Sequence, residues 1–179
     1  MRRHATSLLT FLTFTGVLIV ALKLIDLLPS AIQPEAVRRY ASIAEAKSIL
    51  GIPRIYLPAY FPKTLEWPPS RVLAQKKPFV AVIMEFRSVA SRKVALVVTQ
   101  TSSRRLRQRS AIHLQRIQQT SSVRLKGRES VVESGFCDDG ERCSAITFMD
   151  GGLWINVQMR SSAEELLVLA GSMLSARVR

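Results

Sequence analysis

The sequence contains few of the residue types from which catalytic and metal sites are usually built. It has two cysteines and two histidines, and of the histidines only His113 lies beyond the first few residues. Hydrolase elbows, phosphate-binding glycine loops and dinucleotide-binding glycine patterns are absent from the sequence. No acidic residue lies near His113 in sequence, which favours a packed or solvated histidine over a catalytic base. The sequence therefore predicts a protein that is not an enzyme, with no catalytic residue, cofactor or metal ligand.

Acidic residues are also scarce. The chain has 13 of them against 26 lysines and arginines, which gives a net charge of +13. None lies between Phe86 and Arg128, a stretch that we call the acid-free segment. Its eleven basic residues are Arg87, Arg92, Lys93, Arg104, Arg105, Arg107, Arg109, Arg116, Arg124, Lys126 and Arg128. Because protein surfaces usually mix both signs of charge, this segment predicts a docking surface for an anionic partner. A basic surface kept for solubility is the alternative.

A run of arginines is the densest part of the acid-free segment. The predicted partner-binding residues are Arg104, Arg105, Arg107, Arg109 and Arg116. Arginine side chains bind carboxylate or phosphate through paired hydrogen bonds. The segment has no aromatic residue after Phe86 on which a base could stack, so nucleic acid is not favoured. We expect an anionic protein or lipid surface, or another subunit of a membrane complex. A domain facing the cytoplasm that binds nucleic acid or anionic lipid is the alternative.

The longest uncharged apolar run extends from Leu8 to Leu22, after a basic head at Arg2 and Arg3. It approaches the roughly 20 residues that span a bilayer, so it predicts a single-pass transmembrane helix in contact with membrane lipid. The anchor residues are Leu8, Phe11, Phe14, Leu18 and Leu22. A cleaved signal peptide and a buried core helix are the alternatives. The basic head favours a cytoplasmic N-terminus and an extracytoplasmic domain.

Cys137 and Cys143 flank a strong turn signal, Asp139-Gly140. An odd number of residues separates them, which places them opposite one another in a hairpin centred on Gly140. The Cα separation of such a pair suits a disulfide. Free thiols, or a metal site with the neighbouring acids, are the alternatives. A disulfide indicates an oxidising compartment, in agreement with an extracytoplasmic domain.

The predicted fold class is α+β, with the transmembrane helix followed by a mainly antiparallel sheet and flanking helices. Capping boxes at Ser42–Glu45 and Ser162–Glu165 predict the starts of two helices. Nearly continuous apolar runs at 79–86 and 94–99 predict central strands. Further strands are expected at 123–126, 130–133, 143–149 and 153–159, with a hairpin turn at 150–152.

Three parts are expected along the chain: an anchor at 1–28, a tether at 29–41 and one domain at 42–179. Early in the domain, several prolines and aromatic residues alternate. They are Tyr56, Pro58, Tyr60, Phe61, Pro62, Trp67, Pro68 and Pro69. We expect a loop packed across a sheet edge, with a peptide-docking surface as the alternative.

Several motifs resemble an uncharacterised bacterial domain family found behind a single membrane anchor in sporulation-type and anti-sigma-factor-like proteins. They are Ser42-Ile-Ala-Glu-Ala-Lys, Leu50-Gly-Ile-Pro, Tyr56-Leu-Pro-Ala-Tyr-Phe-Pro, Val123-Arg-Leu-Lys-Gly127, Phe148-Met-Asp-Gly-Gly152 and Glu164-Glu-Leu166. The resemblance covers residues 42–175 and implies an extracytoplasmic α+β domain without an assigned activity. Phe148 replaces the family's usual Trp, and the arginine-rich stretch 104–119 is not part of the family pattern.

Overall fold

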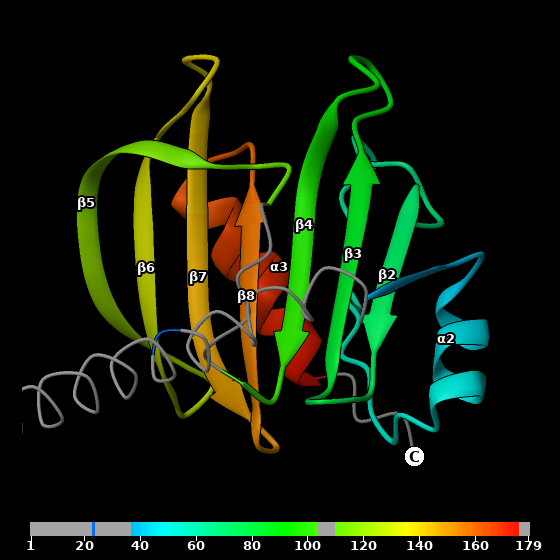
Figure 1. The fold of residues 1–179 in the computed structure, drawn as a ribbon. Helices are drawn as coiled ribbons and strands as arrows, with labels where there is room; N and C mark the ends of the chain where they lie inside the picture. The colour runs from blue at the N-terminus through cyan, green and yellow to red at the C-terminus, as the bar shows by residue number, and fades with distance from the viewer. Residues whose placement is uncertain (1–22, 24–36, 104–109, 176–179) are drawn as a thin grey trace, which may run out of the picture. The chain divides into compact units, whose positions relative to one another are not determined.

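A computed structural model of the protein describes residue 23, residues 37–103 and residues 110–175. A compact unit begins at Arg38 and is built on one eight-stranded sheet, in the order β1-β2-β3-β4-β8-β7-β6-β5 (Figure 1). All neighbouring strands are antiparallel. The strands are β1 (Arg38–Tyr40), β2 (Arg71–Gln75), β3 (Ala81–Arg87), β4 (Val94–Thr101), β5 (Leu114–Leu125), β6 (Arg128–Cys137), β7 (Arg142–Asp150) and β8 (Leu153–Met159). The helices are α2 (Ile43–Leu50) and α3 (Ala163–Ser175).

The sheet consists of two antiparallel meanders that are consecutive in sequence. Strands β1 to β4 form the first and β5 to β8 form the second. The two meet where β4 pairs with β8, for example at Val98 opposite Val157. The apolar runs predicted as central strands are β3 and β4, and both are buried along most of their length. This confirms the prediction of central strands, and since successive residues of a strand point to opposite faces, the sheet is buried on both faces here.

Helix α3 packs on one face of the sheet, which we call the helix face, and lies behind the sheet in Figure 1. The helix contributes four fully buried side chains, Leu166, Leu169, Ala170 and Met173. Against them lie inward-facing residues of the strands, among them Phe148 and Val157. Burying a large apolar side chain contributes about 1.5–3 kcal/mol, so this layer supplies much of the stability. We call the opposite face the open face, because no helix of the described ranges packs on it; it is exposed around β5 and β6 but buried at β3 and β4.

At both predicted capping boxes, the serine side chain caps the start of a helix. Ser42 Oγ accepts a hydrogen bond from Glu45 N, and the Glu45 carboxylate accepts one from Ala41 N at 2.6 Å. Helix α2, which Ser42 caps, ends at Gly51, whose φ of 57° is readily adopted by glycine. Ser162 Oγ likewise accepts from Glu165 N in the first turn of α3. These local signals predicted the helix starts because each depends on residues within a single turn.

The predicted fold class, with its N-terminal transmembrane helix, is wrong. The described chain is mostly one antiparallel sheet with two short helices. In the part of the chain that the structure describes, no helix is long and apolar enough to cross a membrane. The predicted anchor residues Leu8, Phe11, Phe14, Leu18 and Leu22 lie outside that part.

The prediction of a single-pass membrane location, with a cytoplasmic N-terminus and an extracytoplasmic domain, is overturned by the same finding. The apolar run on which it rested is shorter than the roughly 20 residues that span a bilayer, because Lys23 follows Leu22 directly. A short apolar run is weak evidence for a membrane span.

The strand assignments at the two sheet edges also differ from the sequence predictions. Residues 38–40 form β1, although they were expected in a tether. Strand β2 was not predicted, and β5 extends from Leu114 where only 123–126 was expected. The first two-thirds of β5 is polar and exposed, because one of its sides has no neighbouring strand. Such a segment lacks the apolar alternation by which strands are recognised.

Candidate functional site: the β5 edge

Strand β5 forms one edge of the sheet, and within the described ranges it pairs with β6 alone. An edge strand directs unpaired backbone N–H and C=O groups away from the sheet. The ladder with β6 is regular from Gln119 to Leu125, and both register shifts lie before it, at Leu114/Arg116 and Ile117/Gln119. The second half of β5 is therefore a regularly paired edge, and no strand of the described ranges lies on its outer side. The opposite edge, β1, has only three residues.

A tight turn and the helix α3 hold this edge in place. Lys126 and Gly127 connect β5 to β6, and both have positive φ, at 46° and 81°. Two consecutive residues with positive φ form a two-residue turn whose twist matches that of the flanking strands. Val123 and Leu125 are partly buried on the helix face. A Cβ placed on Gly171 of α3 would lie 3.6 Å from Leu125 Cδ1, so helix and strand are in close contact.

The first half of β5 bends across the neighbouring strands. Figure 1 shows β5 arching over the end of β6, and β5 also contacts β7. A Cβ on Gly135 of β6 would overlap the carbonyl group of Arg116. The bend is thus possible because β6 has a glycine at the crossing point and β5 has its two bulges there.

Most of the exposed side chains of β5 are polar or basic, and Ile117, which is 50% exposed, is the apolar exception. Arg116 and Arg124 are exposed, and β5 contains no acidic residue. Glu129 of β6 lies opposite Arg124 in the ladder. Among the described residues, neither arginine forms an ion pair with a carboxylate. Arg128 is different, because its Nε donates to Asp150 Oδ1 at 2.8 Å.

Of the predicted partner-binding residues, the structure describes only Arg116. Arg104, Arg105, Arg107 and Arg109 lie outside the described residues. Sequence reasoning counted Arg124 among the basic residues but did not assign it to the site. The two-residue turn Lys126-Gly127 is the sequence signal that marks the end of this strand.

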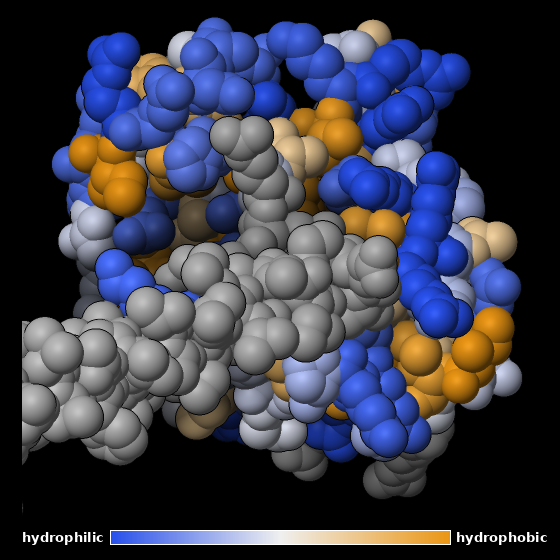
Figure 2. Space-filling model, viewed as in Figure 1, coloured by the Kyte–Doolittle hydropathy of each residue, from blue (hydrophilic) through white to orange (hydrophobic). Residues whose placement is uncertain are grey.

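A groove of about 880 Å³ lies beside the end of β5. Its apolar lining includes Val131, which is 43% exposed, and Met149, which is 50% exposed. Ser122, Arg124 and Glu129 also line it. Figure 2 looks onto the open face and shows a mainly hydrophilic surface around β5 and β6, with separate apolar patches. The groove combines apolar surface with a cationic side chain next to the exposed strand edge.

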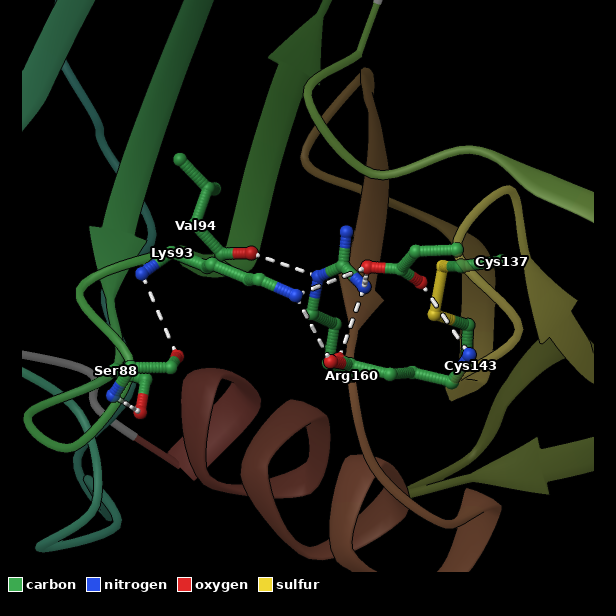
Figure 3. A network of polar contacts seen from close by, with 9 residues as sticks. Ser88, Lys93, Val94, Cys137, Cys143 and Arg160 are labelled. Atoms are coloured by element: carbon green, nitrogen blue, oxygen red, sulfur yellow. Dashed lines mark hydrogen bonds and ion pairs between the residues drawn. A yellow bond between two sulfur atoms is a disulfide. The ribbon is translucent and has the colours of Figure 1, made fainter.

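A second polar cluster surrounds the predicted disulfide, which the structure contains between Cys137 and Cys143, with a Cα separation of 5.6 Å (Figure 3). The two cysteines are not directly opposite. Cys143 pairs with Gly135, and Cys137 N donates to Glu141 O. The turn is therefore centred on Asp139, one residue before the predicted Gly140, and the disulfide runs diagonally between the strands.

Ion pairs connect the disulfide hairpin to the neighbouring strands (Figure 3). Arg160 Nη1 donates to Asp139 Oδ2 at 2.6 Å and to Glu141 Oε2 at 3.0 Å, and Lys93 Nζ lies 3.2 Å from Glu141 Oε1. Arg160 Nε also donates to Val94 O. The hydrogen bond from Arg160 lowers the pKa of the Asp139 carboxyl below its ordinary value. The four charged side chains of this cluster, Lys93, Asp139, Glu141 and Arg160, pair with one another, so the cluster holds strands together.

A third cluster connects the β7–β8 turn to the chain after α2. Asp150 accepts hydrogen bonds from Arg128 and from the Tyr56 hydroxyl, the latter at 2.9 Å. Partial burial raises the pKa of Asp150, but these hydrogen bonds outweigh that effect, so the pKa lies below its ordinary value. The Gln100 side chain also bonds to both Tyr56 N and Tyr56 O. These contacts fix the loop to the sheet.

The proline- and aromatic-rich stretch packs against the sheet, in agreement with the loop interpretation. Trp67 stacks on Phe86 with ring centroids 6.0 Å apart, and Phe61 contacts both rings. An apolar pocket of about 360 Å³ lies between Trp67 and the start of α2. Its lining carries no charged side chain, so it offers no specific contact to an anionic partner.

His113 is exposed and lies just before β5. In the described ranges, no group of three or more histidine, cysteine, aspartate or glutamate residues is placed to hold a metal ion. No family model, curated protein or solved structure matches the chain. The resemblance to the uncharacterised bacterial domain family therefore stays a prediction from sequence motifs.

Proposed function

We propose that this chain is a non-enzymatic interaction module that binds an anionic protein partner through the acid-free segment. The observation that carries the proposal is the β5 edge. It exposes Arg116 and Arg124, contains no acidic residue, and leaves both arginines without a carboxylate partner among the described residues. By contrast, Arg128 of β6 and Arg160, which follows β8, each pair with carboxylates of the fold itself. The guanidinium groups of Arg116 and Arg124 can therefore bind carboxylates of a partner protein.

Carboxylates of a protein suit this surface better than nucleic acid does. Arginine side chains form paired hydrogen bonds with carboxylates. Binding of a single-stranded nucleic acid relies on aromatic side chains on which bases stack, and the acid-free segment has none after Phe86. The apolar lining of the groove, at Val131 and Met149, also provides contact area for the side chains of a protein.

The experiment compares three anionic probes: an acidic peptide of alternating glutamate and valine, a single-stranded RNA homopolymer, and vesicles containing anionic lipid. We expect the peptide to bind and its affinity to fall between low and moderate salt, because exposed charges are screened beyond about 10 Å at 0.1 M. Binding of RNA or vesicles with no binding of the peptide would contradict the proposal.

Two variants locate the binding surface. Replacing Arg104, Arg105, Arg107, Arg109 and Arg116 with glutamine is expected to weaken peptide binding at least tenfold while the fold persists. The loss corresponds to about 1.4 kcal/mol, and exposed ion pairs contribute up to about 1 kcal/mol each. Arg38→Gln/Arg39→Gln, on the opposite edge, is expected to change binding little. Unchanged binding in the first variant would refute the docking role.

A further inference from the structure

We propose that β5 binds its partner by strand addition: an extended acidic segment pairs with residues Gln119–Leu125 and becomes a further strand of the sheet. This inference rests on the proposed function and specifies its partner class and its mode of recognition. It assigns a role to the backbone of the edge as well as to its arginines.

The backbone of β5 is suited to this pairing. In the part of the chain that the structure describes, β5 has a neighbouring strand only on its β6 side, and its ladder is regular from Gln119 to Leu125. Along an antiparallel edge strand, every second residue directs both its N–H and its C=O outward. The stretch contains no proline, which would remove a donor. The bulges that commonly protect a sheet edge are confined to the first half of the strand.

The side chains on the two faces of β5 define the pattern of the incoming segment. On the open face, Thr120, Ser122 and Arg124 are exposed. On the helix face, Val123 and Leu125 are partly buried beside α3. A strand that pairs with β5 must therefore alternate. Its acidic residues lie on the open face near Arg124, and its apolar residues lie on the helix face.

Helix α3 has an exposed apolar side chain one turn before its contact with β5. Val168 lies one helical turn before Gly171, the residue of α3 that approaches Leu125. It is 58% exposed, although α3 otherwise buries its apolar side chains at 166, 169, 170 and 173. The apolar side chains of an added strand would lie on the helix face, beside the place where α3 contacts Leu125. This is the reason for expecting alternation rather than an unbroken acidic run.

Charge selects an acidic segment over a second copy of this chain. Pairing of β5 with the β5 of another copy would bring together two strands that carry arginines and no carboxylate. Like charges opposite one another destabilise a strand pair. Arg116 and Arg124 therefore oppose self-association at the edge, and the same two residues favour a partner with carboxylates. Arg116 lies before the regular ladder, where it can contact a carboxylate at the end of the added segment.

The test uses the full chain and two peptides of about ten residues, a length typical of long strands. Both alternate glutamate and valine, and one has all its central backbone amides methylated. Methylation keeps every charge and removes the backbone donors from both peptide edges. We expect the unmodified peptide to bind at least tenfold more tightly than the methylated one. We also expect it to slow hydrogen exchange at amides of residues 119–125.

Two variants with the same change in charge complete the test. Arg116→Gln/Arg124→Gln is expected to weaken binding of the unmodified peptide about tenfold. Arg38→Gln/Arg39→Gln, at the exposed start of β1, is expected to leave it unchanged.

Equal binding of both peptides, with the same loss in Arg116→Gln/Arg124→Gln, would overturn strand addition and retain the proposed function. No binding of either peptide would overturn both. Hydrogen exchange is also measured without peptide at several protein concentrations. If exchange at residues 119–125 slows as the protein concentration rises, β5 pairs with a second copy of the chain, and the inference is overturned.

Discussion

Gly135 shows how one residue without a side chain permits the bend of β5. The carbonyl group of Arg116 occupies the space that a Cβ would need, and Ile117 Cα would lie only 3.0 Å from that Cβ. The neighbouring atoms belong to the backbone, so they cannot move aside as a flexible side chain would. We expect Gly135→Ala to lower the free energy of unfolding by about 1–3 kcal/mol, the usual cost of overpacking. Urea denaturation measures this change.

Gly171→Ala is the matched control for this substitution. A Cβ at Gly171 would meet Leu125 Cδ1 at 3.6 Å, which is an ordinary contact, and the residue lies inside α3. Alanine stabilises a helix interior by about 0.5–1 kcal/mol relative to glycine. The two glycine-to-alanine changes are therefore expected to shift stability in opposite directions. If both substitutions change the free energy of unfolding by the same small amount, the backbone of β5 does not lie in close contact with Gly135.

At the level of single elements, the disulfide hairpin connects β6 to β7 and carries the acidic partners of Arg160. We expect Cys137→Ser/Cys143→Ser to lower the free energy of unfolding by about 2 kcal/mol, the value that the chain-entropy model gives for so short a loop. Chemical denaturation of the oxidised protein, the reduced protein and the double variant measures the effect. Reduced protein and variant should agree, whereas a reduced protein as stable as the oxidised form would contradict a structural role.

The elements that sequence predicted well are those whose signals are local or whose burial is complete. The capping residues Ser42 and Ser162 mark helix starts, and the apolar runs at 79–86 and 94–99 mark β3 and β4. The turn at 150–152 likewise depends on Asp150-Gly151-Gly152 alone. In each case, a few neighbouring residues determine the conformation, so one sequence is sufficient.

The elements that sequence missed depend on contacts between distant parts of the chain. Strand β2 follows two prolines and is defined by pairing with β3, and the polar half of β5 is defined by pairing with β6. The basic composition of the candidate site could be read directly, but its position at a sheet edge could not. Edge position follows from the strand order, which depends on where β4 and β8 meet.

For the molecule as a whole, acid is expected to act on two carboxylates in particular. The pKa values of Asp139 and Asp150 lie below that of an unfolded aspartate, which is about 3.9. Their contribution to stability is therefore fully present above the unfolded pKa, and it is lost as pH falls through the folded values. The net charge of +13 increases as carboxylates take up protons, which adds self-repulsion.

We therefore expect the free energy of unfolding to change little between about pH 7 and pH 5 and to fall steeply below about pH 4. Urea midpoints measured across that range test this. Asp139→Asn/Asp150→Asn should be less stable at neutral pH and should show a shallower fall in acid. A variant whose stability falls as steeply as that of the unchanged protein would assign the acid sensitivity to other groups.

The β4–β8 pairing differs from the other strand pairings, because it joins strands that are far apart in sequence, whereas the others join consecutive strands. Each meander consists of strands joined by short turns, except where the chain between β1 and β2 includes α2, and such local pairs close at little entropic cost. Only the β4–β8 ladder joins the meanders as neighbouring strands, and its partners, such as Val98 and Val157, are far apart in sequence. Pairings of that kind slow folding, because the intervening chain must be ordered before they form. We therefore expect each meander to assemble before the two meet, and the closure of the sheet at its centre to set the rate of folding.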